Sequence, residues 1–569
     1  MKPVRLLAGA LAVTATTATF FLTTPADATQ NAGPIAPADP ALRPWLPEHK
    51  QPQARAGARA MSDELPGAVE ILRDGITLLH QRTAVSRTPV TGKGATLSDF
   101  DGDGRDDVAA FSGAGVVVTY SSAPARDILI TEIPGGSGCV CFGTEMVTGN
   151  FNGDKYDDLA VGDPYEHDLK GQGYEGGAVW VFAGGPSGLN ADTVKHFNQS
   201  TSGIVGTSAQ GDRFADALAA GDITGDGRDE LLIGLPGKKV GGKKEAGAAV
   251  VLKGSSAGIT TSGSKWIDQN TSGVPGGAET GDHFGTGLAI GKINKDKYRD
   301  VVIGAPQEDD GQAYTGSGSV TQFWGSAAGV SLSKVTAVYG KSTFTVAEPK
   351  DAVVWYLGGV LQIADTSGDG YGEVVVGDSA AQANWMINGG VVVTLAGRST
   401  GLSLKGMILL SQRDKDIAGA SEDDDYFGDS IATGDVTGDG IADVLVGVPG
   451  EDIGSAKNAG SVVLLRGSKK GLTAAKSQTI TQSSAGVPDA PERDDTFGAA
   501  VSVLNLNGAY GLDAVIGAPG ELVTGDTPGY SSGTVTRLYG GSKGLGSGSA
   551  ISGRSLGAAE RYYGYLAHQ

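Results

Sequence analysis

Acidic residues recur at alternate positions in short glycine-containing loops, and the first of these loops shows the pattern most completely. It begins at Asp99 and carries further aspartates at Asp101, Asp103 and Asp107, the third, fifth and ninth loop positions. Calcium is a hard cation that takes about six to eight oxygen ligands from carboxylates, amides and backbone carbonyls. Glycines at positions four and six let the backbone wrap around a small ion, and the Arg105 carbonyl at position seven adds a ligand. The loop therefore predicts a calcium site.

Six further loops share this layout and begin at Asn150, Asp222, Lys292, Asp365, Asp435 and Asn505. We expect calcium in the second, third, fifth and sixth as well as the first, which gives about five sites with a structural role. The expected ligands, with a backbone carbonyl at position seven, are Asn150, Asn152, Asp154, Tyr156 and Asp158; Asp222, Thr224, Asp226, Arg228 and Glu230; Asp365, Ser367, Asp369, Tyr371 and Glu373; and Asp435, Thr437, Asp439, Ile441 and Asp443.

Two loops depart from the pattern. Lys292 opens the fourth loop, where its ammonium can replace the charge of an ion, so occupancy of this loop is left open. The candidate ligands that remain there are Asn294, Asp296 and Asp300. The seventh loop has Ala509 at position five, which leaves too little charge for calcium. Asp-Gly pairs can simply form hairpin turns, but a turn needs one such pair, whereas these loops keep four oxygen-bearing residues at fixed offsets.

The loops belong to a longer repeat. From the second loop onward they lie 70 to 73 residues apart, and a Phe-Gly pair or a substitute precedes each loop by eight residues. An apolar run ending in a turn follows most loops, then a β-branched run and a polar run. The polar runs end near Gln199, Gln269, Gln412 and Gln482, each 15 residues before the next phenylalanine. Each repeat thus holds four segments of strand length separated by turn signals.

This repeat predicts an all-β, seven-bladed β-propeller of four-stranded blades with calcium-binding loops, spanning residues 69–569. A blade cannot bury both faces alone, and a ring is favoured over a linear solenoid because the terminal repeats lack polar caps. Ring closure is left open. Residues 75–81 resemble an outer strand that could complete the seventh blade, and residues 560–567 resemble the start of an eighth repeat.

The N-terminal residues predict export. Residues 1–28 read as a signal peptide, with Lys2 and Arg5 before an apolar run and cleavage after Ala28 in an Ala-x-Ala motif. A retained membrane anchor is the weaker alternative, because the run is short and rich in threonine. Residues 29–68 are rich in proline and alanine and predict a flexible leader. We therefore expect a secreted, extracellular protein.

The composition of the chain limits the kinds of partner that it can bind. The net charge of −20 disfavours nucleic acids and anionic membranes, and its concentration in the loops favours bound cations. No further stretch is apolar and long enough to span a membrane. We expect a monomer that binds an unknown extracellular protein or glycan. The two cysteines, Cys139 and Cys141, either close a small strained disulfide or remain thiols.

The order of Phe-Gly, Asp-x-Asp-Gly-Asp-Gly-x-x-Asp and Gly-Ala-Pro resembles the FG-GAP repeats of integrin α-subunit propellers and of their secreted bacterial relatives. The resemblance covers about residues 70–569. It implies a calcium-binding propeller used in adhesion or ligand binding, and some relatives attach the propeller to an enzyme, as in a phospholipase. The chain departs from integrins because it has no inserted adhesion domain, leg domains or transmembrane helix, so adhesion rests on analogy.

The alternative is a calcium-dependent propeller enzyme that acts on extracellular polysaccharide as a lyase or hydrolase. Gly-x-Ser-x-Gly occurs at Ser256, Ser399 and Ser542, but always on the same hairpin turn, which favours a turn over a nucleophile elbow. The six histidines never recur in register. The residues that keep the alternative open are His167, Lys170, Tyr174, Lys238, Lys239, Lys243 and Lys244, in loops 163–176 and 237–246. We assign no catalytic residue.

Overall fold

The computed structural model describes residues 69–73, 76–82, 96–111, 115–121, 126–131, 142–166, 176–309, 316–340, 352–353, 356–383, 389–509, 511–523, 531–552 and 566. All of them belong to one compact unit, Asp39–Gln569. The expected signal peptide and leader lie outside the described residues, and so do Cys139 and Cys141.

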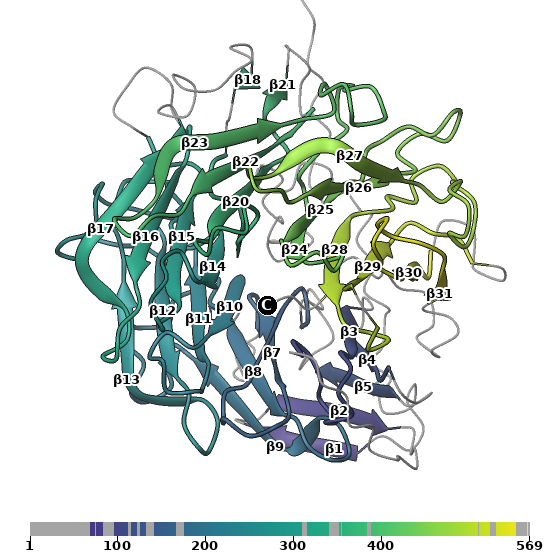
Figure 1. Cartoon of the computed structure of the whole chain (residues 1–569). Coiled ribbons are helices and arrows are strands. Elements are labelled where there is room, and N and C mark those ends of the chain that lie inside the picture. The colour runs from purple at the N-terminus through teal and green to yellow at the C-terminus, as the bar shows by residue number, and fades with distance from the viewer. Residues whose placement is uncertain are drawn as a thin grey trace, which may run out of the picture. The chain divides into compact units, whose positions relative to one another are not determined.

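The described part of the chain forms six four-stranded antiparallel blades (Figure 1). Their strands pair in the order of the sequence, and each blade packs against the next through its first strand. The blades are β6 (Glu145–Gly149), β7 (Asp158–Asp163), β8 (Ala178–Ala183) and β9 (Asn190–Asn198); β10 (Ala217–Gly221), β11 (Glu230–Leu235), β12 (Ala248–Lys253) and β13 (Thr260–Ile267); β14 (Leu288–Gly291), β15 (Asp300–Ala305), β16 (Ser319–Trp324) and β17 (Ser331–Tyr339); β19 (Val360–Ala364), β20 (Glu373–Asp378), β22 (Val391–Ala396) and β23 (Ser403–Leu410); β24 (Ile431–Gly434), β25 (Asp443–Val448), β26 (Ser461–Arg466) and β27 (Thr473–Ile480); and β28 (Ala500–Leu504), β29 (Asp513–Ala518), β30 (Thr534–Leu538) and β31 (Gly548–Ser552).

The expectation of seven four-stranded blades is therefore wrong in its count. The first Asp loop instead leads into a five-stranded sheet of order β1-β2-β5-β4-β3. Its strands are β1 (Val69–Arg73), β2 (Ile76–Arg82), β3 (Val108–Phe111), β4 (Val116–Thr119) and β5 (Arg126–Thr131). A further short pair joins β18 (Ala352–Val353) to β21 (Gln382–Ala383).

The segment 75–81 does not complete the last blade, which already has four strands of its own. Most of it forms β2, which continues the ladder of β5 through pairs such as Leu79 with Ile130. The hairpin β1–β2 thus extends the outer edge of the first sheet. Its nearness in the sequence to that sheet, rather than its strand pattern, determines which blade it joins.

The end of the chain meets the inner edge of the same sheet. Leu566 is buried and forms an antiparallel bridge with Ala110 of β3. In the blade β10–β13, Leu218 pairs in the same way with Ile233, which follows its Asp loop by the same number of residues as Ala110 does. Leu566 therefore takes the position of an inner-strand residue in the first sheet, in line with the likeness of residues 560–567 to the start of a repeat.

The phenylalanine of each Phe-Gly pair fixes one blade to the preceding one. Phe284, which precedes the blade β14–β17, forms a parallel bridge with Gly247 at the start of β12 and is fully buried. Gly247 has φ of 83°, and a Cβ there would lie 2.1 Å from the Phe284 carbonyl oxygen, so this contact requires glycine. The substitute Leu357 makes the same bridge with Gly318.

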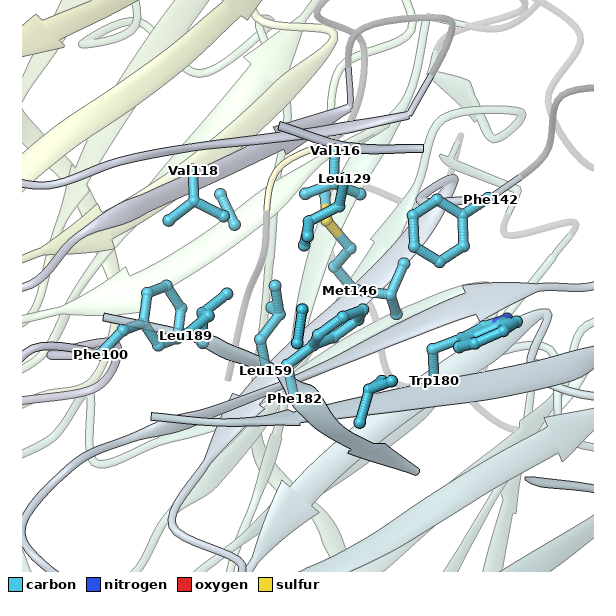
Figure 2. Packing of buried hydrophobic residues seen from close by; sticks show 14 of the residues in the cluster. Phe100, Val116, Val118, Leu129, Phe142, Met146, Leu159, Trp180, Phe182 and Leu189 are labelled. Carbon is cyan, nitrogen blue, oxygen red and sulfur yellow. The ribbon is translucent and has the colours of Figure 1, made fainter. Parts of the chain in front are cut away.

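Apolar side chains fill the spaces between neighbouring sheets. Figure 2 shows the cluster between the first sheet and the blade β6–β9, where Val116 and Leu129 face Met146 and Leu159. Trp180 lies in the same cluster and meets the Phe142 ring edge-on, with ring centroids 6.2 Å apart. The apolar faces of the strands thus stack sheet on sheet, as the repeat pattern requires.

Candidate metal-binding loops

The second to seventh Asp loops are the hairpin turns between the first two strands of a blade, and the first Asp loop precedes β3 of the five-stranded sheet. In the six blades the residue before loop position one pairs with position nine, as Gly221 does with Glu230 and Gly434 with Asp443. The two ends of each loop are therefore fixed by the β-ladder. The intervening residues must turn back within this short span, which places the side chains of alternate positions on the inner side of the turn.

In the first loop the carboxylate of Asp99 is held by the backbone of its own turn. Its oxygens accept hydrogen bonds from the N–H groups of Gly102 and Gly104, both at 2.7 Å, and of Asp103 at 3.0 Å. One oxygen each from Asp99, Asp101 and Asp107 lies within 4.8 Å of the others. The structure thus brings three of the four predicted carboxylates together, and the fourth, Asp103, is 3% exposed with no hydrogen-bond partner for Oδ2.

Burial of like charges dominates the electrostatics of this loop. Desolvation raises the pKa of Asp107 well above its usual value, and the nearby charges of Asp101 and Asp99 raise it further. Burial, with a further contribution from Asp103, also raises the pKa of Asp99. A divalent cation would offset this repulsion, and the orphaned Asp103 oxygen and the all-oxygen donor set suit a hard ion such as Ca²⁺.

The third, fifth and sixth loops repeat the backbone wrapping with more solvent exposure. Asp435 accepts from the N–H of Asp439 at 2.9 Å and of Gly440 at 2.7 Å, and Asp222 and Asp365 make the equivalent pairs. The position-five carboxylates of these loops are exposed, unlike Asp103. Burial raises the pKa of Glu230, at position nine of the third loop, to about 7. Among the described loops, a group of three close carboxylate oxygens occurs in the first alone.

The second, fourth and seventh loops are less suited to a cation. Asn150 turns its amide nitrogen into the second loop, where it donates to the Asp154 carbonyl at 2.6 Å. Lys292 is exposed at the start of the fourth loop. In the seventh loop the Asn507 amide donates to Asp513 at 3.0 Å, which uses a carboxylate oxygen that an ion would need.

The carboxylate at position nine has a structural task in addition to any ion. In the second loop, Asp158 accepts from the Phe151 N–H at 3.0 Å and from the Gly184 N–H at 2.9 Å. Asp513 of the seventh loop makes the equivalent pair of bonds although that loop lacks the other acidic residues. An acidic residue at position nine is therefore required by the blade itself, and its presence alone does not indicate a metal.

Neighbouring loops are hydrogen-bonded head to tail all the way round. The N–H at position eight of each loop donates to the carbonyl of position one in the preceding loop, at 2.8 to 3.1 Å. The bonds run from Asp157 to Asp99, Asp229 to Asn150, Arg299 to Asp222, Gly372 to Lys292, Ala442 to Asp365, Leu512 to Asp435, and Asp106 to Asn505. The last of these joins the first loop to the seventh, so the described loops form a closed ring.

Three acidic residues at position eight were not among the predicted site residues. Asp106, Asp157 and Asp229 each accept a second inter-loop bond on a side-chain oxygen, from the position-one N–H of the preceding loop. Burial raises the pKa of Asp157 to about 7. The signal in the sequence was the acidic doublet that ends each of the first three loops, such as Asp106-Asp107, of which the ligand pattern explains only the second member.

The side chain at position seven covers the preceding loop. A Cβ on Gly102 would lie 2.5 Å from the Tyr156 ring, and one on Gly153 would lie 2.9 Å from Arg228. The glycine at position four thus makes room for a side chain of the next blade. In the first loop this side chain is the Tyr156 ring.

Among the described residues that keep an enzyme in view, the serines lie in turns and Lys238 has a structural partner. Ser256, Ser399 and Ser542 all lie in turns, as expected. Lys238 is buried and donates to Asp212 at 2.6 Å, so it has a structural partner. His167, Lys170 and Tyr174 lie outside the described residues. A search of the described residues for a helix long and apolar enough to cross a membrane finds none.

Comparison with known proteins identifies the repeat. The FG-GAP repeat family model matches residues 142–182, 214–252, 284–321 and 427–465. Phosphatidylinositol-glycan-specific phospholipase D of Rattus norvegicus is 29% identical over 191 residues, which cover 33% of this chain and 21% of the phospholipase. Integrin alpha-PS2 of Drosophila melanogaster is 30% identical over 192 residues, which cover 33% of this chain and 12% of the integrin.

The match therefore spans 21% of the length of the phospholipase and 12% of the length of the integrin. A solved rhamnogalacturonan lyase, YesW, aligns with 80% of this chain and 69% of its own at 11% identity, but the TM-score of 0.30 is too low to bear on function. The repeat matches, the integrin relatives and the stacked four-stranded blades agree with one another. This chain therefore carries FG-GAP repeats in a β-propeller of stacked four-stranded blades and is similar to integrin α-subunits over part of its length.

Proposed function

We propose that this protein is a secreted, calcium-binding propeller that acts as an extracellular adhesion or ligand-binding protein. The observation that supports it most is the closed ring of Asp loops, in which each acidic turn is joined to its neighbours by backbone hydrogen bonds. A ring fixed in this way presents its exposed loops as one rigid surface. Rigid scaffolds that carry variable loops are the usual basis of recognition by repeat proteins.

Calcium has a structural role in this proposal. The ligands in the first loop would be Asp99, Asp101, Asp103 and Asp107 with the Arg105 carbonyl, and the third, fifth and sixth loops would use the equivalent positions. A bound ion supplies the positive charge that the buried carboxylates otherwise lack. It would also fix position one of each loop, whose carbonyl accepts the bond from the next blade. Ion binding would thus stiffen single turns and the ring together.

Binding fits the described residues better than small-molecule catalysis does. A cavity lined by first-strand residues of several blades, among them Thr148, Gln362 and Thr433, measures about 90 Å³. Sites for small molecules usually measure about 300 to 1,000 Å³. A partner larger than this cavity would meet the exposed loops. Extracellular calcium-binding modules typically bind the ion with dissociation constants of about 10⁻⁴ to 10⁻³ M, so weak sites suffice for this role.

Export rests on the N-terminal residues. The charged start, the apolar run and the Ala-x-Ala motif support removal of residues 1–28, which would leave Thr29 as the first residue. N-terminal sequencing of protein collected from the growth medium tests this directly. A mature chain that retains residues 1–28 would contradict it.

The ligand-binding role is tested with the purified full chain on a glycan array and on a panel of immobilised extracellular proteins. We expect saturable binding to a defined partner with calcium present and its loss on chelation, because the loops would then relax. The same glycans are tested in parallel for cleavage by the protein. Turnover of any polymer would contradict the proposal and favour the polysaccharide lyase or hydrolase instead.

A further inference from the structure

A second set of polar residues recurs where one blade leads into the next. The four glutamines that follow the last strands, Gln199, Gln269, Gln412 and Gln482, are all buried. Each contacts the residue 39 positions later, which lies in the turn after the second strand of the following blade. An aspartate 13 positions after each glutamine is also buried. These residues lie outside the Asp loops and do not belong to their ligand pattern.

In one of these junctions the chain supplies its own cation. Gln199 contacts Lys238, and the Lys238 ammonium donates to the Gln199 Oε1 at 2.7 Å, to Asp212 at 2.6 Å and to the Thr207 carbonyl at 2.5 Å. The lysine side chain is 9% exposed. A positive charge is thus surrounded here by three oxygen atoms, each from a different group, as in a small cation-binding site.

The last junction has the same frame without that lysine. Glu521 stands where Lys238 stands, and Glu492 stands where Ala209 does, while the glutamine and aspartate are kept as Gln482 and Asp495. The Glu492 N–H donates to the Asp495 carboxylate, just as the Ala209 N–H donates to Asp212. We call Gln482, Glu492, Asp495 and Glu521 the junction cluster. Compared with the junction that contains Lys238, the junction cluster has two more carboxylates and no lysine ammonium.

The junction cluster is short of positive charge and of hydrogen-bond donors. One oxygen each from Glu492, Asp495 and Glu521 lies within 4.8 Å of the others. Asp495 is 0% exposed and its Oδ1 has no hydrogen-bond partner; Gln482 is 3% exposed and its Oε1 has none either. Burial, then the charges of Asp495, Asp489 and Glu492, raise the pKa of Glu521 to about 8, against which Gln482 supplies the opposing hydrogen bond.

We propose that the junction cluster binds a Ca²⁺ ion in the place that the Lys238 ammonium takes in the third repeat. Three carboxylates and an amide oxygen form an all-oxygen donor set, which suits calcium rather than a metal that prefers nitrogen or sulfur. The ion would join Gln482 and Glu492, which lead out of the blade β24–β27, to Glu521 of the next blade. The proposal does not depend on metal in the Asp loops, because no residue is shared.

The last junction differs from two of the remaining ones in geometry rather than in residue types, because Glu279 and Glu422 stand at the position of Glu492. Glu166 stands at the position of Glu521 in the second repeat, and His196 contacts it at 2.8 Å. Glu308 and Glu451 are paired with Gln269 and Gln412 as Glu521 is with Gln482. Outside the first Asp loop, however, three carboxylate oxygens converge within 4.8 Å in the last junction alone among the described residues.

The test exchanges the two arrangements in the full chain. Glu492→Ala combined with Glu521→Lys gives the last junction the residue types found at Ala209 and Lys238. Ions are counted by native mass spectrometry with CaCl₂ as the sole metal, and folding is checked by circular dichroism. We expect a folded protein with one Ca²⁺ fewer than the wild type. A folded variant that holds the wild-type number of ions overturns the proposal.

The reciprocal variant, Ala209→Glu with Lys238→Glu, covers the case in which the first variant does not fold. It creates the carboxylate set in the third repeat, and we expect one Ca²⁺ more than the wild type. No additional ion in this folded variant overturns the proposal. Asp103→Ala in the first Asp loop serves as the comparison. Its effect on the ion count tests the Asp loops separately, so failure of one set of sites is distinguishable from failure of the other.

Discussion

At the scale of single residues, the first Asp loop contains buried carboxylates whose oxygen atoms are only partly hydrogen-bonded. Asp99 is wrapped by three backbone N–H groups, but Asp103 keeps a buried oxygen with no partner. An unpaired buried carboxylate is costly, so a proton or a compensating positive charge would stabilise the loop. The exposed acidic residues of the later loops lose less without an ion, because water can solvate them.

The first prediction concerns this difference. Asp103→Ala should remove one Ca²⁺ and lower the melting temperature in calcium by several degrees, because an ion that binds only the folded state stabilises it. Calorimetry with and without chelator, and native mass spectrometry, measure the two effects. Asn507→Ala in the seventh loop is the matched control and should leave the ion count unchanged. A melting temperature of the wild type that does not respond to chelator would contradict calcium binding in these loops.

At the scale of the strand and turn, the Phe-Gly pair joins blades through one bulky side chain and one glycine. The Phe284 ring fills the space beside the preceding blade, and Gly247 allows the backbone to approach it. Leucine is accepted at the equivalent position 357, where it is also fully buried. The site therefore requires apolar volume rather than an aromatic ring.

A matched pair of variants at Phe284 tests whether the site requires apolar volume or an aromatic ring. Phe284→Ala should destabilise the protein by about 3 to 5 kcal/mol, because it leaves a cavity between two blades. Phe284→Leu should cost far less, because the chain itself uses leucine at position 357. Urea unfolding followed by fluorescence measures both. Equal losses for the two variants would show that the ring, and not the filled volume, is what the site needs.

Most of the strands and turns were predictable from the sequence, because they depend on residues that are close together in the chain. A strand, an Asp loop and a second strand are contiguous, so the spacing of Asp222 and Glu230 sets the hairpin that contains them. The bond between Asn150 and Asp229 joins residues 79 positions apart, and no spacing rule within one repeat reveals it. The contacts of the junction cluster are not predictable for the same reason, although the register of the four glutamines is visible in the sequence.

At the scale of the whole molecule, the sequence did not predict how the first sheet is assembled. Residues 75–81 have the composition of an outer strand, and most of them form β2, but β2 lies between β1 and β5 of the first sheet. Residues 560–567 resemble the start of a repeat, and Leu566 takes the corresponding place beside Ala110. Which strands share a sheet depends on contacts between distant segments, and composition describes only the segments.

A further prediction tests this contact. Leu566→Asp places a carboxylate in a buried apolar cluster with Val108, Ala110 and Val515, and should lower the melting temperature and speed unfolding. Leu522→Asp is the matched control, because Leu522 is 47% exposed and should tolerate the change. Thermal melts and unfolding rates in urea measure both variants. Indistinguishable behaviour would mean that Leu566 contributes nothing to holding the first sheet in place.

The hydrogen bond between Asp106 and Asn505 joins residues 399 positions apart, and Arg537 reaches Thr119 across 418. Contacts of such sequence separation are slow to form, because the chain loses loop entropy before it gains them. During synthesis the first sheet must therefore wait for the last blade, with its inner edge open to wrong pairing. We expect chains cut short before Asn505 to aggregate, and export before folding would postpone closure until the entire chain has left the cell.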